Sequence, residues 1–399
     1  MNLSYQNLFN FFTAFDDFIW GPPLLILLVG TGFYLTMRLG FLQVRYLPLA
    51  LSYLFGGRKE EGQSGKGDVS SFAALCTALS ATVGTGNIVG VATAIKLGGP
   101  GALFWMWLAA FFGMATKYAE CLLAVKYRQF DEKGQVLGGP MYYLEKGVGS
   151  QWLAKLFAFF AIAVACFGIG TFPQANAIVE AAQISFNLPK EVTVVVLTAL
   201  VAVVTLGGIK SIAKVASTIV PLMVLFYIGA CLLVLGNHLQ ALPLAFVLVV
   251  KSAFTGQAAT GGFVGAGIML AIQSGIARGV FSNESGLGSA PIAAAAGRTN
   301  SCVRQGLVSM TGTFFDTLII CTMTGLTLIV TDVWSGDLAG AAMTTHAFAK
   351  GLNSIFYGPM LVSIGLMLFA FTTIIGWNYY GERCVAYLFG VKAILPYKV

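Results

Sequence analysis

Charged side chains are scarce in this chain of 399 residues, of which 10% are charged and 57% are hydrophobic. Soluble domains carry about 25% charged residues. Apolar runs of about 20 residues, the length that crosses a bilayer, recur along the sequence. A soluble domain of this size rarely holds so many of them in one core. The composition therefore predicts a multi-pass protein of the cell membrane, with the lipid bilayer as its surroundings.

Histidine and paired cysteines are also scarce. The two histidines, His238 and His346, fall in predicted loops, and none of the seven cysteines has a CxxC partner. Zinc sites and disulfide frameworks need such spacing, so neither is expected. No nucleophile–base set is apparent, so we do not expect an enzyme, and we expect no organic cofactor. The net charge of +7 does not indicate a nucleic-acid partner, because the basic residues lie in short loops between apolar runs.

The apolar runs predict long helices at 18–37, 72–95, 102–125, 155–180, 192–207, 215–236, 262–297, 306–331 and 357–380. The first follows two aspartates rather than a basic region, so we expect a retained helix with Trp20 at the membrane interface. The segment 262–297 is too long and too glycine-rich for one straight helix. We expect two half-helices there that meet near Ser282–Gly288. The stretch 242–254 is expected at the interface, and 338–355 as an outer loop with a short helix.

Lysine and arginine are unevenly distributed between the loops. If the N-terminus is outside, 17 of the 23 basic residues lie in inner loops and four lie in outer loops. Cytoplasmic loops of membrane proteins carry an excess of lysine and arginine. We therefore predict that the N-terminus is outside.

With this orientation, the helices that begin near 72 and 262 start on opposite sides of the membrane. Both are rich in glycine and polar residues at mid-span. Two bundles of opposite orientation, each opening with an interrupted helix, are typical of inverted-repeat transporters. We interpret 1–399 as one membrane transport domain, with an extra helix at 18–37, a first repeat at 72–236 and a second at 262–399. The second repeat is shorter, so we expect that it lacks about two C-terminal helices.

The segment 80–90, SATVGTGNIVG, interrupts an apolar run with glycines and polar side chains. Lipid offers no hydrogen-bond partners to an opened backbone, so such a break is expected to face a ligand. The backbone amides of Thr85 and Gly86 are suited to a carboxylate, and Asn87 has an oxygen for Na⁺. The alternative is close helix packing, because Gly86 and Gly90 also have GxxxG spacing. The surrounding polarity favours the binding site.

The segment 278–288 is the matching break in the second repeat, and it holds two charges, Arg278 and Glu284. Charges within a span usually face a cavity or each other. Phe281 is placed to pack on a substrate side chain. An ion pair that holds the two half-helices together is at least as good an explanation of Arg278 and Glu284 as direct ligand contact.

Other spans also carry polar residues. Thr372 and Thr373 are suited to an ion, or only bond back to the preceding turn. Trp377 caps a small pocket or belongs to the interfacial belt, and Gln174 faces a substrate or a neighbouring helix. Asp316 lies in mid-span, where a carboxylate is protonated, paired or part of a proton relay.

Glycine-rich motifs follow one another along the chain at 82–87 (TVGTGN), 98–113 (GGPGALFWMWLAAFFG), 138–143 (GGPMYY), 207–212 (GGIKSI) and 279–291 (GVFSNESGLGSAP). In this order they resemble the alanine or glycine:cation symporters, also called sodium:alanine symporters. The resemblance implies an all-α, leucine-transporter-like inverted-repeat fold with discontinuous helices and an added N-terminal helix. It also implies uptake of alanine, glycine or similar small neutral amino acids, driven by Na⁺ or H⁺ as the coupling ion.

The resemblance also transfers individual roles to residues of this chain. It implies that the amino acid is bound by Thr85, Gly86, Gln174, Phe281 and Trp377. It implies a Na⁺ site at Ser80, Val83, Phe369, Thr372 and Thr373. Thr82 and Asn87 match positions where some relatives have a second Na⁺ site.

These observations lead to the hypothesis of a secondary active symporter that works by alternating access. Two alternatives stay open at this point. One is a truncated, transport-inactive membrane protein that binds an amino acid without moving it. The other is a channel, which would need a continuous polar stripe along several helices.

Overall fold

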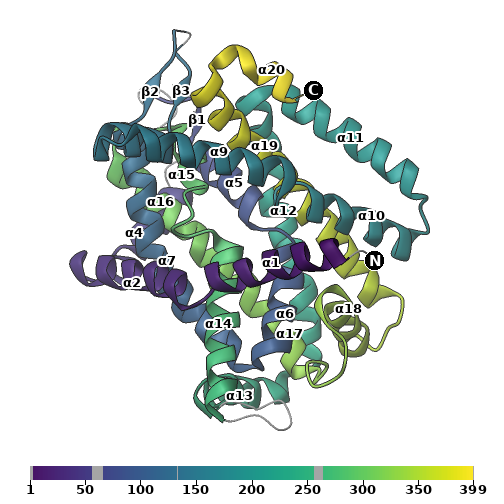
Figure 1. Cartoon of the computed structure of the whole chain (residues 1–399). Helices are drawn as coiled ribbons and strands as arrows, with labels where there is room; N and C mark the ends of the chain where they lie inside the picture. Colours follow the sequence, from purple (N-terminus) through teal and green to yellow (C-terminus); the bar gives the residue numbers. More distant parts are fainter. Residues whose placement is uncertain (1–2, 56–65, 133, 256–263, 399) are drawn as a thin grey trace.

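The computed structural model describes residues 3–55, 66–132, 134–255 and 264–398, and most of them are helical (Figure 1). In this part of the chain, five helices are long and apolar enough to cross a bilayer, or six if one bent pair counts as a single span. The prediction of a multi-pass, mostly helical membrane protein is confirmed. Residues 262 and 263, the start of one predicted helix, lie outside the described residues.

The first part of the chain contains two π-helical segments, η2 (Gly86–Gly90) and η3 (Leu144–Val148). Its α-helices are α1 (Leu3–Ile19), α2 (Pro22–Arg38), α3 (Leu42–Arg45), α4 (Leu47–Phe55), α5 (Ser71–Thr82), α6 (Val91–Gly98), α7 (Gly101–Lys126), α8 (Pro140–Tyr143), α9 (Gln151–Phe167), α10 (Phe172–Phe186), α11 (Lys190–Leu206) and α12 (Gly208–Asn237). The pair Ser71–Thr82 and Gly86–Gly98 is bent by 54° and forms the broken span. Helices α9 and α10 together cover the span predicted at 155–180.

The second part contains η4 (Leu239–Ala241), α13 (Leu242–Thr255), α14 (Val264–Asn283), α15 (Ala290–Ala295), α16 (Cys302–Thr313), η5 (Phe314–Cys321), α17 (Thr322–Val330), α18 (Gly340–Gly351), α19 (Tyr357–Phe389), η6 (Val391–Ala393) and α20 (Ile394–Lys398). Helix α16, the π-helical η5 and α17 form one long apolar span. The helix predicted at 262–297 is divided into α14 and α15, as expected.

The N-terminal region differs from the prediction of one helix at 18–37. The structure has two helices, α1 and α2, which are separated at Trp20–Gly21. Proline is favoured in the first turn of a helix, which explains why α2 starts at Pro22. Helix α2 packs closely on α7, and Gly32 permits this approach. A Cβ at this position would lie only 2.7 Å from the carbonyl oxygen of Phe112. The asparagines and glutamine of α1 interrupt its apolar pattern, and the prediction missed this helix.

The two broken helices lie against each other and between two long helices. Helix α6 packs on α14, and α5 packs on α15. Helix α7 contacts α14, α15 and α16, whereas α19 contacts α5, α9, α10 and α12. The breaks are therefore enclosed by packed helices.

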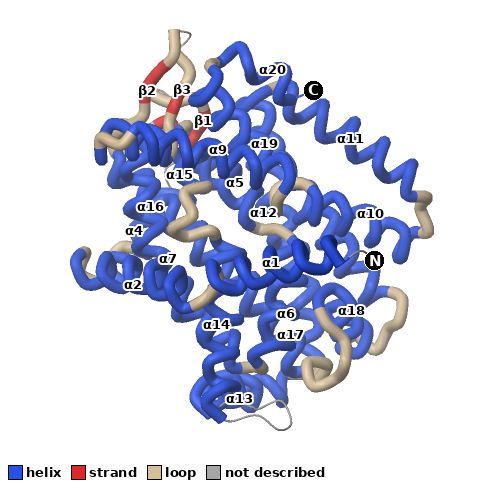
Figure 2. Tube along the Cα trace, viewed as in Figure 1, coloured by secondary structure: helices blue, strands red, loops and turns tan. Residues whose placement is uncertain are grey.

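Two short strand pairs lie at one end of the helical body (Figure 2). Strand β1 (Val69–Ser70) pairs in parallel with β4 (Gly297–Arg298), and β2 (Gln129–Phe130) pairs antiparallel with β3 (Val136–Leu137). β1 directly precedes α5, and β4 follows α15. The guanidinium of Arg128 donates to the carbonyl oxygens of Lys66, Ala295, Gly297 and Thr299 at 2.8–2.9 Å. Arg128 thus binds the segment before β1 and the segment that contains β4.

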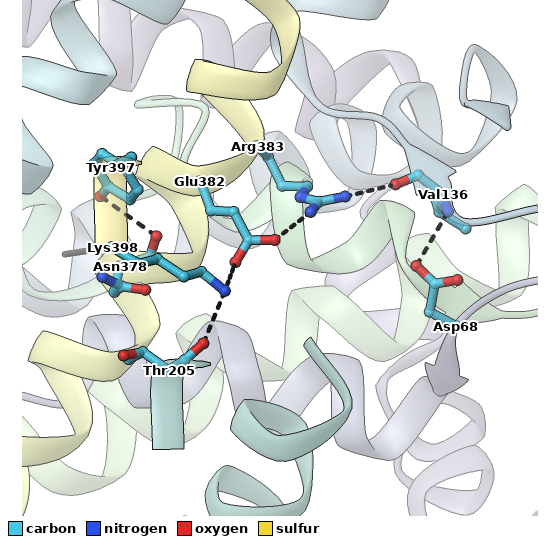
Figure 3. Close-up of polar contacts among 8 residues, drawn as sticks. All are labelled: Asp68, Val136, Thr205, Asn378, Glu382, Arg383, Tyr397 and Lys398. Carbon is cyan, nitrogen blue, oxygen red and sulfur yellow. Dashed lines mark hydrogen bonds and ion pairs between the residues drawn. The ribbon is translucent and has the colours of Figure 1, made fainter. Parts of the chain in front are cut away.

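A buried polar cluster lies at the same end of the molecule (Figure 3). Glu382 of α19 forms ion pairs with Arg383 and with Lys398 Nζ, the latter at 2.6 Å. Lys398 also donates to the carbonyl oxygen of Thr205 at 2.7 Å. Arg383 donates to the carbonyl oxygen of Val136 at 3.4 Å, and the Val136 N–H donates to Asp68 Oδ2 at 3.1 Å. The cluster joins α19 to α11, α20, β3 and the segment before α5.

Asp68 lies outside the spans, and its titration gives a testable pH dependence. Burial raises the pKa of Asp68 above its usual range, and the Val136 N–H and the charge of Arg383 offset only part of this rise. A carboxyl with a raised folded-state pKa stabilises the fold at low pH, and this contribution is lost as the pH rises through the folded-state pKa. Asp68→Asn should therefore raise the unfolding temperature of the purified protein at pH 7. The difference from wild type should shrink as the pH falls toward 3.8, the ordinary aspartate value.

The exposed loop residue Asp337 provides the matched control for this measurement. Asp337→Asn should change the unfolding temperature little at either pH. A lower unfolding temperature for Asp68→Asn at pH 7 would contradict the argument.

Candidate functional site

The first break follows directly from the glycines and Asn87. Helix α5 ends at Thr82, and Val83 has extended backbone angles (φ −76°, ψ 92°). Glycine disfavours helical winding, and an asparagine side chain competes for backbone groups. Accordingly, the Gly84 N–H donates to Asn87 Oδ1 at 2.9 Å, so that the Asn87 side chain binds the backbone within the break. Thr85 and Gly86 lie at the N-terminal end of that half-helix, where N–H groups lack helical partners.

The second break lies between Asn283 and Ala290, as the sequence predicted. Glu284, Gly286 and Gly288 all have positive φ, with values of 55°, 86° and 80°. Glycine adopts this conformation readily, whereas a glutamate rarely does. The Ser285 N–H donates to Asn283 Oδ1 at 2.9 Å, which closes the end of α14.

A small cavity lies between the two breaks. Its lining comes from both broken spans, from the connection between α9 and α10, and from α10 and α19: Ala81, Thr82, Gly84, Gly86, Ile169, Gln174, Phe281, Glu284, Thr373 and Trp377. It has room for about one water molecule. Four of the five predicted substrate residues line it, and the fifth, Thr85, accepts a hydrogen bond from Gln174 Nε2 at 3.1 Å. The structure therefore brings all five together.

A larger groove of about 1000 Å³ adjoins this cavity. Ile169, Phe281 and Trp377 line both spaces. Trp20, which we expected at the membrane interface, lines the edge of the groove at the junction of α1 and α2. The small cavity and the groove therefore meet at these three residues.

Two polar side chains, Gln174 and Glu284, line the cavity. The sequence predicts that Gln174 binds the substrate, whereas for Glu284 it leaves open an ion pair with Arg278 or contact with a ligand. Gln174 Nε2 also donates to the Ile169 carbonyl oxygen at 3.0 Å, whereas its buried Oε1 has no partner among the described residues. Glu284 accepts from Trp377 Nε1 at 3.2 Å and from the Ser289 hydroxyl. Arg278 stacks over the Phe281 ring at 5.7 Å, and within the described chain it forms no ion pair with Glu284. The ion pair considered for the second break is not formed.

The residues predicted for Na⁺ lie where α5 crosses α19, and all are buried: Ser80, Val83, Phe369, Thr372 and Thr373. A Cβ at Gly84 would lie 2.5 Å from Thr373 Oγ1, and one at Gly376 would lie 2.8 Å from Ser80 Oγ. The hydroxyls of Thr372 and Thr373 donate to the Phe369 carbonyl oxygen at 3.0 and 2.9 Å. The back-bonding that the sequence suggested is therefore present, at a crossing rich in oxygen atoms.

Thr82 and Asn87, which we expected at a second Na⁺ site, do not point to a common position. Thr82 lines the small cavity, and its hydroxyl lies 3.5 Å from the Leu79 carbonyl oxygen. The amide of Asn87 is directed to η5, where Nδ2 donates to Asp316 Oδ1 at 2.8 Å. The two side chains have different surroundings in this structure.

Asp316 is the centre of a network that the sequence analysis did not place in a site. The fully buried carboxylate accepts from Asn87 through Oδ1 and, through Oδ2, from the hydroxyls of Ser282 at 2.7 Å and Thr317 at 2.8 Å. Asn87 belongs to the first broken span and Ser282 to the second. One carboxylate of the π-helical η5 therefore joins both broken helices. A single aspartate within an apolar run was the only sequence signal for it.

Two interrupted spans around a small polar cavity, in a multi-pass helical protein, are typical of secondary transporters. The sodium:alanine symporter family model matches residues 5–399. The chain belongs to this family.

Its relatives include carriers with assigned solutes. An uncharacterized transporter of Haemophilus influenzae is 61% identical over 388 residues, which cover 97% of this chain and 84% of that protein. The sodium/alanine symporter AgcS of Methanococcus maripaludis is 50% identical, over 96% of this chain and 84% of AgcS. The probable sodium/glutamine symporter GlnT of Bacillus subtilis is 38% identical, over 95% of this chain and 77% of GlnT. A manganese transporter mutant of Eremococcus coleocola aligns in three dimensions with a TM-score of 0.48 and 12% identity, over 82% of this chain and 69% of that chain.

Proposed function

We propose that this protein is a secondary active symporter that couples Na⁺ influx to the uptake of a small neutral amino acid such as alanine or glycine. The observation that carries the proposal is the small cavity that both broken spans enclose. Membership of the sodium:alanine symporter family supports Na⁺ over H⁺ as the coupling ion. The names of the sodium/alanine symporter AgcS and of the probable sodium/glutamine symporter GlnT support an amino acid as the solute.

The substrate carboxylate binds at the N–H groups of Thr85 and Gly86 in this proposal. They lie at the N-terminal end of a half-helix, where the helix dipole favours negative charge. Phe281 and Trp377 restrict the space for the side chain, and Gln174 contributes its amide. The cavity holds about one water molecule in the present conformation, so it widens when the amino acid enters.

The coupling ion binds at the crossing of α5 and α19, with oxygen ligands from Ser80, Val83, Phe369, Thr372 and Thr373. Hard cations such as Na⁺ prefer oxygen ligands, which carbonyl and hydroxyl groups supply here. Thr373 adjoins Gly84, so an ion at the crossing orders the break that receives the amino acid. Because coupling free energies are reciprocal, bound amino acid also raises the affinity for the ion.

The same proposal includes the arrangement in the membrane. The repeats at 72–236 and 262–399 have opposite orientation, as in the leucine-transporter-like fold, the N-terminus is outside, and the helix at 18–37 is additional. Alternating access then exposes the site between the repeats to each side in turn. Packed side chains close the space between the breaks, which favours a carrier over a channel.

Uptake of radiolabelled alanine by proteoliposomes tests the proposed function. An inward Na⁺ gradient should drive alanine above its external concentration, whereas a K⁺ gradient of the same size should not. Flux should saturate with alanine. Accumulation driven by a proton gradient alone would reject Na⁺ coupling, and alanine binding without flux would reject transport.

A further inference from the structure

Glu284 is a buried carboxylate in the wall of the small cavity. Its side chain is 1% exposed, and its backbone has a φ of 55° at the second break. Trp377 Nε1 donates to Oε1 at 3.2 Å, and the Ser289 hydroxyl donates to Oε2. Both donors are neutral. A non-glycine residue in this conformation costs about 1 kcal/mol or more, which is retained where the surroundings fix it.

No basic side chain forms an ion pair with Glu284 among the described residues. The charge of the buried Lys117 reaches Glu284, but Lys117 Nζ lies 3.7 Å from Glu120 Oε1, with which it is paired. Arg278 lies over the ring of Phe281. Glu284 and the similarly buried Asp316 are thus two carboxyl groups near the breaks whose described hydrogen bonds come from neutral donors. A buried carboxylate that lacks a charged partner favours a cationic group beside it.

A second acceptor lines the same cavity. Gln174 is 3% exposed and directs both of its described hydrogen bonds through Nε2, so that its buried Oε1 remains without a partner. A buried acceptor without a donor is unfavourable, and a bound group that donates a hydrogen bond would relieve it. A charged acceptor and a neutral acceptor on one cavity complement an ammonium group, which has three donors and no acceptor.

We propose that Glu284, together with Gln174 Oε1, holds the α-ammonium group of the substrate and makes the protein selective for amino acids over 2-hydroxy acids of the same size. This inference rests on the proposed function and assigns the second charged group of the zwitterion. The substrate carboxylate binds at Thr85–Gly86 in the first break, and the ammonium binds at the second. The amino acid then joins the two broken spans through its opposite charges.

Binding of alanine and lactate to the purified protein in detergent tests this inference. Lactate keeps the carboxylate and methyl group of alanine but has a hydroxyl in place of the ammonium. Glu284→Gln keeps the shape and one acceptor oxygen for Trp377 Nε1, and its amide N–H can donate to the Ser289 hydroxyl, but the charge is removed. Since hydrogen bonds to charged groups are the strong ones, alanine affinity should fall by about tenfold to a hundredfold, while lactate affinity should be unchanged. Calorimetry at constant Na⁺ measures the ratio of the two affinities.

Glu382→Gln is the matched control, because Glu382 is also a buried carboxylate but lines neither the cavity nor the groove. This variant should keep the wild-type ratio even where its unfolding temperature is lower. An unchanged ratio in Glu284→Gln would overturn the inference. So would a wild-type protein that binds lactate as tightly as alanine, a result that does not depend on whether any variant folds. A wild-type protein that binds alanine selectively but does not accumulate it would instead reject the proposed function and leave this assignment intact.

Discussion

Gly84→Ala should reduce Na⁺-driven alanine uptake by about tenfold to a hundredfold, the effect of roughly 1–3 kcal/mol of overpacking. A Cβ at this position would lie 2.5 Å from Thr373 Oγ1. The Thr373 hydroxyl is held by its bond to the Phe369 carbonyl oxygen, and β-branched side chains have few alternative rotamers. Relief therefore requires that α5 and α19 separate at the proposed ion site. The measurement is initial uptake into proteoliposomes, with the Na⁺ concentration for half-maximal rate as a second readout.

Gly90→Ala is the control on the same broken span. A Cβ at Gly90 would meet nothing within 4 Å, and its backbone is helical (φ −63°). The new methyl group should leave uptake within about twofold of wild type, because alanine is the better helix former. Equal uptake by the two variants would show that the contact between Gly84 and Thr373 is unimportant for transport.

Asp316→Ala should abolish uptake and lower the unfolding temperature by roughly 5–10 °C. The substitution removes the carboxylate acceptor of Asn87 Nδ2 and of the hydroxyls of Ser282 and Thr317. Asn87 Nδ2 keeps the carbonyl oxygen of residue 316 at 3.2 Å, whereas the two hydroxyls lose their carboxylate oxygen. Each unsatisfied buried group costs about 1–3 kcal/mol, less what the groups recover by pairing with one another. The link from η5 to both broken spans is lost with the same carboxylate. Scanning fluorimetry and proteoliposome uptake measure the two effects.

Asp316→Asn separates the loss of charge from the loss of the acceptor. One oxygen remains for Asn87 or for the two hydroxyls, so its unfolding temperature should lie between those of Asp316→Ala and wild type. Asp332→Asn is the matched control, since Asp332 is exposed and has a φ of 53°, a conformation that asparagine tolerates. A wild-type unfolding temperature for Asp316→Ala would exclude the network as a stabilising element.

The breaks in the helices were predictable because they depend on local chemistry. Gly84, Gly86 and Asn87 weaken the first span where they occur, and the glycines at 286 and 288 do so in the second. The structure ends α5 at Thr82 and α14 at Asn283, within the predicted segments. The pattern of apolar residues could not predict that Gln174 and Trp377 lie beside the first break, because both are distant from it in the sequence. The family resemblance supplied that expectation.

Interactions between distant segments explain most of what the sequence analysis missed. Asp316 was recognised as unusual, but its partner Asn87 is 229 residues away, and no pattern connects them. Glu284 was assigned an ion pair with Arg278 as one option, because both charges lie in one segment. The turn at the break instead directs Glu284 to Trp377 of α19. The N-terminal α1 was missed because its phenylalanines alternate with polar residues.

The parallel pairing of β1 with β4 has a mechanical consequence for any cycle of opening and closing. Residues 67–70 connect Lys66, whose carbonyl oxygen binds Arg128, to the start of α5 at Ser71. Helix α15 ends at Ala295, whose carbonyl oxygen binds the same guanidinium. If α5 moves, either the hydrogen bonds between β1 and β4 must break or α15 must move with it. Helices α5 and α15, which belong to different halves of the chain, are thus coupled at the β1–β4 end and should move together there as one rigid unit.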